Sequence, residues 1–294
     1  MQWGIGFANA NIQNVLLQKA WPKNITWLPI QHSLNFIADP FIFKNKQGNL
    51  FVLYEDFSPE QNGFIAIKAL DEQFNTINEK ILLQTNTHLS YPFIIEEAGT
   101  TYIIPETQQT NNLIAYPFNF ETLSVEKGIP ILNNTGILDA TFLKYDNKYW
   151  IFASVGDGIN FNNQLNIYYA DGLFGQYTPH QNNPVKNNLD GSRPAGAIIQ
   201  IADTYYRPAQ NCKAYYGQSI TINKIKTLTT TCFEEEVHCI LTADAFKYYT
   251  DGVHTINSIK DEIIVIDGIK MIFMPLLKLK LFIKTLLGRS IILK

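Results

Sequence analysis

The chain has 294 residues, which suffices for one large all-β domain or for two smaller domains. Hydrophobic residues make up 46%, charged residues only 17% and aromatic residues 13%, a composition that excludes a disordered chain, a coiled coil and a collagen-like repeat. The net charge of −3 at pH 7 leaves no basic field of the kind that binds nucleic acid, so we expect no nucleic-acid partner.

One sequence pattern recurs five times along the chain. Each copy consists of two short β-rich runs joined by a tight turn, which predicts a β-hairpin, and the copies span residues 38–55, 91–106, 139–154, 193–210 and 254–267. Counted from position 39, the copies begin 52, 48, 54 and 61 residues apart. Each step is about the length of one four-stranded propeller blade. The sequence therefore predicts an all-β, five-bladed β-propeller.

The stretches between the hairpins supply further strands. Residues 63–67, 112–116 and 165–170 are β-rich and suit the third strand of a blade. Residues 3–7 at the start of the chain are predicted to close the ring by pairing with the last blade. We expect the propeller to occupy residues 1–268.

Polar residues recur at the open ends of the five hairpins. In a hairpin, paired positions sum to a constant, so the first residue of each copy is predicted to face the last. Five such ends would form a ring of polar side chains at the mouth of a central channel. The expected facing pairs are Asp39 with Glu55, Tyr91 with Glu106, Asp139 with Ser154, Arg193 with Gln210, and His254 with Asp267.

Nine short motifs carry a resemblance to a known family. They are Trp3–Gly6, Ala38–Phe41, His88–Phe93, Ile104–Thr107, Tyr169–Asp171, Arg193–Gly196, Tyr206–Gln210, Gly252–Thr255 and Ile266–Gly268. Together they resemble the five-bladed propellers of the glycoside hydrolase family 43-like superfamily, and within it the N-terminal propeller domain of glucosamine inositolphosphorylceramide transferases and its bacterial relatives.

The resemblance implies a carbohydrate-handling channel with carboxylates from different blades. Family 43 members place a general-base Asp at the start of the first blade, which matches Asp39, and use an Asp and a Glu from the next two blades. The second hairpin here begins with Tyr91, so Glu106 and Asp139 are the candidates left. Cleavage of a glycosidic bond needs one ionised and one protonated carboxyl group. We assign Asp39 as base, Glu106 as acid and Asp139 as the group that modulates the acid.

Other polar residues near the predicted mouth are candidate substrate contacts, because guanidinium, imidazole and carboxylate groups bind sugar hydroxyls. For each, a purely structural role is the alternative: a turn for the acids, an ion pair for the arginines and a satisfied hydrogen bond for the histidines. The candidates are Glu55, His88, Tyr91, Arg193, Arg207, Gln210, His254 and Asp267.

Metal and cofactor motifs do not occur in the sequence. The three cysteines show no C-x-x-C spacing, and the H-E-x-x-H, Walker, G-x-G-x-x-G and G-x-S-x-G patterns are absent. We therefore expect no cofactor, no zinc site and no disulfide framework, and we assign no metal-ligating residues; whether an ion occupies the channel is not predicted. With no signal-peptide pattern at the start, a cytoplasmic location is the expectation.

The segment 269–294 differs from the rest in charge. It carries six basic residues and no acid, which leaves −9 for the remainder of the chain. We expect a short basic, apolar C-terminal tail. Contact with a membrane surface, at the inner face, through residues 270–294 is one interpretation, and packing on the propeller or on a partner is the other.

Three functions remain open from the sequence. The first is action on a glycosidic linkage at the channel mouth, as in a glycoside hydrolase. The second is glycosyl transfer in surface-glycan assembly, with a glycan acceptor as partner, which the missing signal peptide and the basic tail favour. The third is a non-catalytic glycan-binding propeller. Oligomeric state is not predicted.

Overall fold

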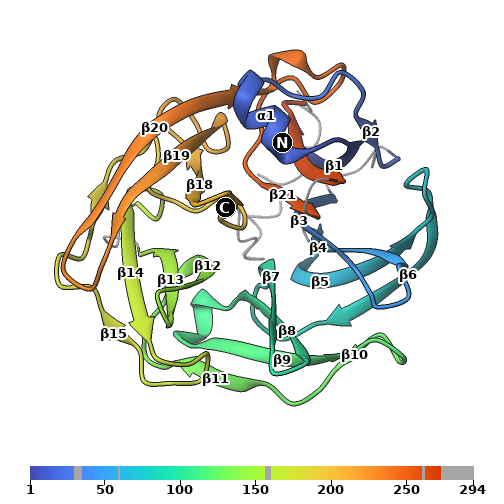
Figure 1. Ribbon diagram of the computed structural model, residues 1–294. Coiled ribbons are helices and arrows are strands. Elements are labelled where there is room, and N and C mark those ends of the chain that lie inside the picture. Colours follow the sequence, from blue (N-terminus) through green and yellow to red (C-terminus); the bar gives the residue numbers. More distant parts are fainter. Residues whose placement is uncertain (30–34, 59, 156–159, 260–261, 273–294) are drawn as a thin grey trace, which may run out of the picture.

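The computed structural model describes residues 1–29, 35–58, 60–155, 160–259 and 262–272. Five antiparallel sheets surround one central axis, so the predicted five-bladed β-propeller is confirmed (Figure 1). Among the described helices, none has the length and apolar character to cross a membrane. Most of the predicted basic tail lies outside the described residues.

The first three blades are antiparallel meanders whose first four strands pair in chain order, and in the second and third blades a short fifth strand pairs with the third strand. Their first strands, β3, β7 and β12, lie nearest the axis (Figure 1). The strands are β3 (Phe36–Lys44), β4 (Leu50–Ser58), β5 (Gln61–Leu70) and β6 (Thr76–Leu83); β7 (Ser90–Glu97), β8 (Thr100–Glu106), β9 (Leu113–Asn119), β10 (Ser124–Val125) and β11 (Ile129–Leu132); and β12 (Leu138–Tyr145), β13 (Lys148–Ser154), β14 (Gln164–Ala170), β15 (Thr178–Pro179) and β16 (Lys186–Asn187). The third strands β5, β9 and β14 lie where the sequence places them.

The fifth blade joins the two ends of the propeller. The strands of the last two blades are β17 (Ile199–Ile201), β18 (Thr204–Asn211), β19 (Ser219–Leu228) and β20 (Phe233–Thr242); and β21 (Ile256–Ile259), β22 (Ile263–Lys270), β1 (Gln2–Asn9) and β2 (Thr26–Trp27). Strand β1 pairs with β22 along its whole length. The prediction that residues 3–7 close the ring is therefore confirmed. Because β22 continues to Lys270, the last blade extends two residues past the expected boundary.

The blades hold together because each strand near the axis is buried on both faces. In β4, Phe51 and Leu53 pack in the core shared with the second blade, whereas Leu50, Val52 and Tyr54 pack in the core shared with the fifth. Burial on both faces explains why this strand has a continuous run of apolar residues in place of alternation. This packing between neighbouring blades holds the inner strands in place, and the channel mouth lies where those strands begin.

One helix, α1 (Ile12–Gln18), was not anticipated from the sequence. The side chain of Asn11 caps its start by accepting from the N–H of Gln13 at 2.7 Å. Ile12, Val15 and Leu16 are buried in a core that also contains residues of the fourth and fifth blades. Their i, i+3, i+4 spacing is the signal that would have predicted the helix.

Candidate functional site

The channel mouth is built by a backbone feature that three blades share. Asp39, Tyr91 and Asp139 have φ of 52°, 44° and 52°, in the left-handed region that side-chain-bearing residues rarely adopt. At each of them the pairing of the inner strand with its neighbour is interrupted by a bulge. Strained backbone of this kind is held only by surrounding structure and clusters at functional sites.

Because of the bulges, the register of these three hairpins differs from the predicted facing pairs by one residue. Glu55 pairs with Ala38, Glu106 with Ser90, and Ser154 with Leu138, so the residue before each predicted partner lies opposite. The left-handed residue that follows has no partner on the neighbouring strand. The prediction assumed regular pairing along each hairpin, so it could not anticipate the bulge. In the fourth blade the N–H of Gln210 donates to the carbonyl of Arg193 at 2.8 Å, as predicted.

In the fifth blade the expected pairing is also shifted by one residue. Asp267 lies opposite Thr255, to whose carbonyl its N–H donates at 3.3 Å, and not opposite His254. The Asp267 side chain nevertheless reaches back to His254, so the two predicted residues are in contact.

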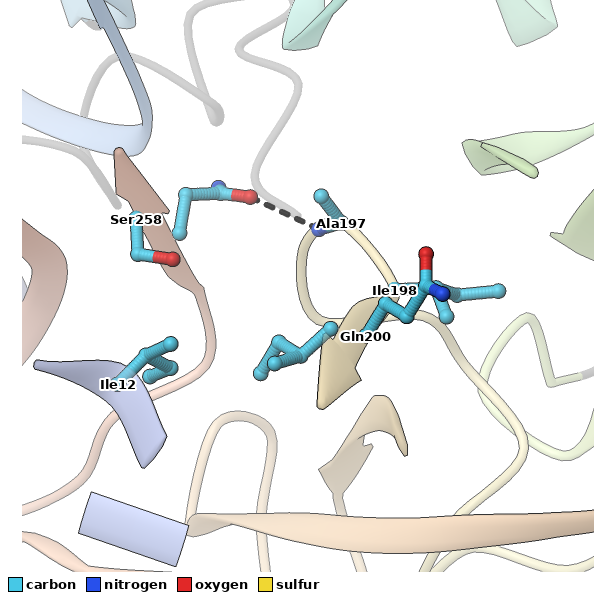
Figure 2. A pocket seen from close by; sticks show the side chains of 7 residues that line it. Ile12, Ala197, Ile198, Gln200 and Ser258 are labelled. Carbon is cyan, nitrogen blue, oxygen red and sulfur yellow. Dashed lines mark hydrogen bonds between the residues drawn. The ribbon is translucent and has the colours of Figure 1, made fainter. Parts of the chain in front are cut away.

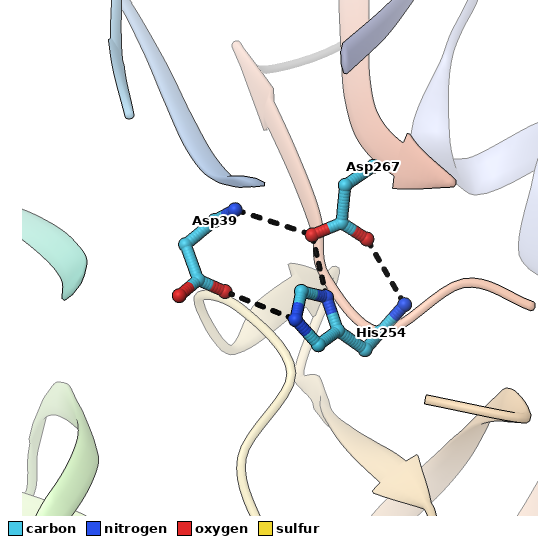
Figure 3. Close-up of side chains that lie close together, drawn as sticks. All are labelled: Asp39, His254 and Asp267. Carbon is cyan, nitrogen blue, oxygen red and sulfur yellow. Dashed lines mark hydrogen bonds and ion pairs between the residues drawn. The ribbon is translucent and has the colours of Figure 1, made fainter. Parts of the chain in front are cut away.

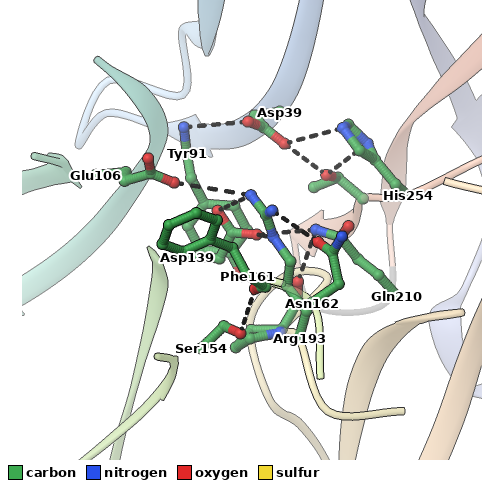
Figure 4. Close-up of polar contacts among 12 residues, drawn as sticks. Asp39, Tyr91, Glu106, Asp139, Ser154, Phe161, Asn162, Arg193, Gln210 and His254 are labelled. Atoms are coloured by element: carbon green, nitrogen blue, oxygen red, sulfur yellow. Dashed lines mark hydrogen bonds and ion pairs between the residues drawn. The ribbon is translucent and has the colours of Figure 1, made fainter. Parts of the chain in front are cut away.

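Asp39 lies at the centre of the site with its side chain 7% exposed (Figure 4). Its Oδ1 accepts from Thr255 Oγ1 at 2.9 Å and its Oδ2 from the N–H of Tyr91 at 3.3 Å. Burial raises the pKa of Asp39 to about 7, the nearby His254 opposes this rise, and other carboxylates, Asp139 first among them, add to it. The group is thus poised between its ionised and protonated forms near neutral pH.

His254 bridges Asp39 and Asp267 (Figure 3). Its Nδ1 lies 2.5 Å from Asp267 Oδ2 and its Nε2 lies 3.7 Å from Asp39 Oδ1. Burial alone would lower the pKa of His254, but ion pairing with Asp267 and with Asp39 raises it to about 9. The two carboxylates therefore favour the imidazolium form of His254.

These three side chains are close enough together to be tested as metal ligands, since one ligand atom of each lies within 4.8 Å of the others. Asp267, however, accepts four hydrogen bonds: Oδ1 from the N–H groups of His254 and Thr255, and Oδ2 from the N–H of Asp39 and from His254 Nδ1. A carboxylate has about four acceptor positions. The arrangement fits a hydrogen-bonded relay and not a metal-ligand set.

On the other side of the channel, Arg193 holds Asp139. The guanidinium approaches both carboxylate oxygens, with Nε 2.5 Å from Oδ2 and Nη2 3.2 Å from Oδ1, and Gln210 Nε2 donates to Oδ2 at 2.8 Å. Arg193 Nη2 also lies 3.8 Å from Glu106 Oε2, and its Nη1 donates to Asn162 Oδ1 at 3.0 Å. Figure 4 shows Glu106, Asp139, Arg193 and Gln210 converging on this side.

The charge state of Asp139 reflects competing neighbours. Burial raises its pKa to about 6, the guanidinium of Arg193 opposes the rise, and Glu106 adds to it through its charge and a hydrogen bond. Two carboxyl groups in hydrogen-bonding contact share one proton more readily than they ionise together. This side therefore contains a proton-sharing acid pair held by one arginine.

Tyr91 lies fully buried between the two halves of the site. Its hydroxyl group contacts Thr141 Oγ1 at 2.7 Å and accepts from the N–H of Gly196 at 2.7 Å, which links the second blade to the third and to the start of the fourth. Burial raises the pKa of the Tyr91 phenol well above its usual range. The residue therefore holds blades in place through its side chain and orients Asp39 through its backbone.

Glu55 and His88 form a separate pair at the first blade. Gly63 donates its N–H to His88 Nδ1 at 3.1 Å, which assigns the proton to Nε2, and this atom contacts Glu55 Oε1 at 3.0 Å. A Cβ on Gly63 would lie 2.5 Å from His88 Cε1, so the close approach requires glycine. The pair is buried and acts on Asp39 through the charge of Glu55.

Arg207 is not brought into the centre. This fully buried residue of β18 forms a two-point ion pair with Glu235 of β20, at 2.6 and 2.9 Å, and donates to the carbonyls of Gly191 and Ser192. Lys186 of β16 binds the same carboxylate at 2.7 Å. These contacts join the third blade to the fourth, a structural role.

Four residues of the site were missed by sequence reasoning. Thr255 and Trp3 each belong to a quoted motif but were given no role in the site. Trp3 stacks on His254 with ring centroids 3.9 Å apart. Tyr216 packs on Trp3 and under the Arg193 guanidinium. Asn162 lies in a loop with no pattern, so nothing in the sequence indicated it.

A cavity of about 370 Å³ lies at the gap between the fourth and fifth blades and helix α1 (Figure 2). Asn257 borders it, donating to the carbonyl of Pro40 and accepting from the N–H of Ala197, both at 2.8 Å. Its described lining residues contain no carboxyl or imidazole group: Ile12, Ala197, Ile198, Ile199, Gln200, Asn257 and Ser258. It therefore offers no acid–base chemistry.

Comparison with known proteins gives one family. Residues 24–259 match the family described as glucosamine inositolphosphorylceramide transferase 1, N-terminal. The chain is 31% identical to glucosamine inositolphosphorylceramide transferase 1 of Oryza sativa subsp. japonica over 210 residues and to that of Arabidopsis thaliana over 208 residues. Each match covers 68% of this chain but only 28% and 27% of the relative, so the chain spans less than a third of those proteins.

Solved structures share the fold. A Bacillus subtilis levansucrase variant in complex with oligosaccharides superposes with a TM-score of 0.52 and 14% identity, covering 70% of this chain and 69% of that one. The Cellvibrio cellulosa α-L-arabinanase complexed with arabinohexaose gives 0.51 and 13%, covering 67% and 76%. At such identity the likeness establishes the propeller fold alone.

Proposed function

This chain belongs to the family of the N-terminal region of glucosamine inositolphosphorylceramide transferase 1, and on that premise we propose that it processes a glycan at the centre of the propeller. The reaction we propose is attack of a hydroxyl group on a glycosidic linkage. The relatives carry the name of a transferase, and two structural neighbours were crystallised with oligosaccharides, which supports a carbohydrate ligand.

Asp39 is the base in this proposal, and its setting is the observation that carries it. A general base works best when its pKa lies near the working pH, and burial raises that of Asp39 to about 7. The Tyr91 N–H and the Thr255 hydroxyl group orient its two oxygens. Asp39 would take the proton from the attacking hydroxyl as that oxygen bonds to the anomeric carbon.

The acid is assigned to the opposite side of the channel. Arg193 and Gln210 bind Asp139, which leaves Glu106, whose Oε2 lies 3.8 Å from the same guanidinium, as the acid. Glu106 would give a proton to the leaving oxygen as the glycosidic C–O bond breaks. Asp139 then modulates the acid, and Arg193 positions the pair.

Product analysis by mass spectrometry tests the reaction. Wild type and Asp39→Asn are offered a panel of furanosides and pyranosides, with and without activated sugar donors. We expect turnover in wild type and a loss of about 10²–10⁴-fold in the variant, the usual contribution of a general base. Asp203→Asn, which changes an exposed carboxylate on the β17–β18 turn, should leave turnover unchanged.

The products also separate the two enzyme classes. Release of free sugar means that water is the attacking hydroxyl and the protein is a hydrolase. Extension of an acceptor sugar means glycosyl transfer, which the names of the relatives favour. Equal turnover in wild type and Asp39→Asn removes Asp39 from the mechanism.

A non-catalytic glycan-binding propeller is the second candidate. The observation that favours it is the binding of Asp139 by Arg193 and Gln210, because an arginine-neutralised carboxylate suits recognition as well as chemistry. This candidate predicts glycan binding without turnover in both wild type and Asp39→Asn.

A further inference from the structure

A stacked Trp–His pair lies directly behind the base. The indole ring of Trp3 and the imidazole ring of His254 are nearly parallel, with an interplanar angle of 17° and centroids 3.9 Å apart. Both side chains are buried. Asp267 fixes the Nδ1 edge of the imidazole at 2.5 Å, and the Nε2 edge points to Asp39, as Figure 3 shows.

We propose that Trp3, His254 and Asp267 are positioning residues that hold an imidazolium beside Asp39, which favours the ionised form of Asp39 that acts as base. This inference rests on the proposed function in that it assigns a task to the ionised form of Asp39. Its geometric content, an ion relay in which Asp267 orients His254 and His254 neutralises Asp39, stands without any substrate.

The charges around the relay make the imidazolium necessary. Asp39 faces three further carboxylates, Asp139, Glu55 and Asp267, each of which disfavours its ionisation. His254 is the cation that opposes them, whereas Arg193 is bound to Asp139 on the far side, with the ring of Tyr216 beneath it. An ionised carboxylate buried without a counter-ion is strongly disfavoured.

Trp3 contributes in a second way. The face of an indole ring attracts a cation placed over it, so the stack stabilises the charged form of His254. Trp3 belongs to β1, the strand that closes the propeller. The indole ring that stabilises the charged form of His254 is therefore in place only when β1 has closed the propeller.

The stack also provides the readout, because an imidazolium quenches the fluorescence of an indole ring in contact with it more strongly than a neutral imidazole does. The experiment is a pH titration of tryptophan fluorescence in wild type, with the Trp3→Phe variant subtracted to isolate Trp3. We expect a rise in Trp3 emission with a midpoint well above 6.5, the ordinary pKa of histidine. His254→Gln should abolish the step.

Carboxylate variants test the relay itself. Asp39→Asn and Asp267→Asn each remove one counter-charge of His254, so each should move the midpoint to lower pH, with the larger shift for Asp267→Asn. Asp203→Asn, at an exposed turn, should leave it unchanged. A midpoint at or below 6.5, or one that neither variant moves, overturns the proposal.

A second measurement covers the case in which a variant does not fold. Long-range ¹H–¹⁵N NMR spectra of wild type report both ring nitrogens of each histidine, and one imidazole should remain doubly protonated past neutral pH. If no imidazole of the wild-type protein is doubly protonated above neutral pH, the proposal is overturned, and this result does not depend on any variant. If the relay is found but Asp39→Asn retains full turnover, the proposed function is wrong and the relay stands. If turnover depends on Asp39 but the carboxylate variants do not move the midpoint of the Trp3 fluorescence titration, the relay is wrong and the proposed function stands.

Discussion

Glu235 and Asp139 are both buried carboxylates bound by an arginine, yet their neighbours shift their pKa values in opposite directions. Although burial disfavours its charge, Arg207 and Lys186 together lower the pKa of Glu235. Asp139 has one cation, Arg193, set against burial and Glu106, so its pKa is raised. An acid with two cations stays ionised and serves a structural ion pair, whereas two acids around one cation include a carboxyl group with a raised pKa that can exchange a proton.

At this scale we predict the effect of Glu235→Gln. The substitution leaves Arg207 fully buried with no ionised partner, so the free energy of unfolding should fall by about 3–5 kcal/mol. Chemical denaturation measures the loss. The control is Glu236→Gln in the same strand, whose side chain is 56% exposed and should change stability by no more than about 0.5 kcal/mol. Equal losses in both variants would contradict the assignment.

Among the elements, β1 has two tasks, since it closes the ring and carries Trp3 to the site. Its pairing with β22 places Gly4 opposite Gly268, and Tyr249 lies close to both glycines, with its ring against Gly4 and its Cβ against Gly268. A Cβ on Gly4 would lie 2.2 Å from Tyr249 Oη and 2.9 Å from its Cε1. Because Tyr249 is itself buried, its ring has little room to move.

Gly4→Ala should therefore weaken ring closure. Forcing a methyl group against Tyr249 is expected to lower the free energy of unfolding by about 1–3 kcal/mol, as overpacking does elsewhere. Thermal or chemical denaturation measures it. Gly172→Ala is the matched control, because a Cβ there meets no atom within 4 Å. A Gly4→Ala variant as stable as Gly172→Ala would show that β1 tolerates the methyl group.

Three titratable groups of the central site have pKa values that are shifted in one direction. The pKa values of Asp39 and Asp139 are raised to about 7 and about 6, and that of His254 to about 9. In each case the folded protein binds its proton more tightly than the unfolded chain does. Stability from these groups is therefore present at low pH and is lost as pH rises through the folded values.

We expect the melting temperature to be highest in mildly acid solution and to decline between about pH 5 and pH 9. Below about pH 4 the trend reverses, because Glu235, whose pKa is lowered, loses its ion pairs on protonation. Differential scanning calorimetry across this range measures the profile. In Asp39→Asn the decline between pH 5 and pH 7 should become shallower. A melting temperature that rises steadily to pH 9 would contradict this account.

The propeller could be predicted from the sequence because each blade is local. Its hairpins, its third strands and even the closing segment 3–7 are marked by β-rich runs at a regular spacing, and stacking of blades requires such runs to be apolar on both faces. Most of the central residues followed from the same repeat, since equivalent positions in each blade meet at the axis. Helix α1 was missed, although its apolar spacing is visible in the sequence.

The chemistry of the site depends on contacts between residues far apart in the chain, which no local pattern encodes. Left-handed backbone at Asp39, Tyr91 and Asp139 shifts the hairpin register by one residue, and only the assembled blades hold it there. Arg193 and Arg207 sit in one hairpin and look equivalent in sequence. Tertiary structure alone directs Arg193 to the acids on the axis and Arg207 to Glu235 of its own blade, because a buried cation needs a carboxylate within reach and only the folded chain brings one there.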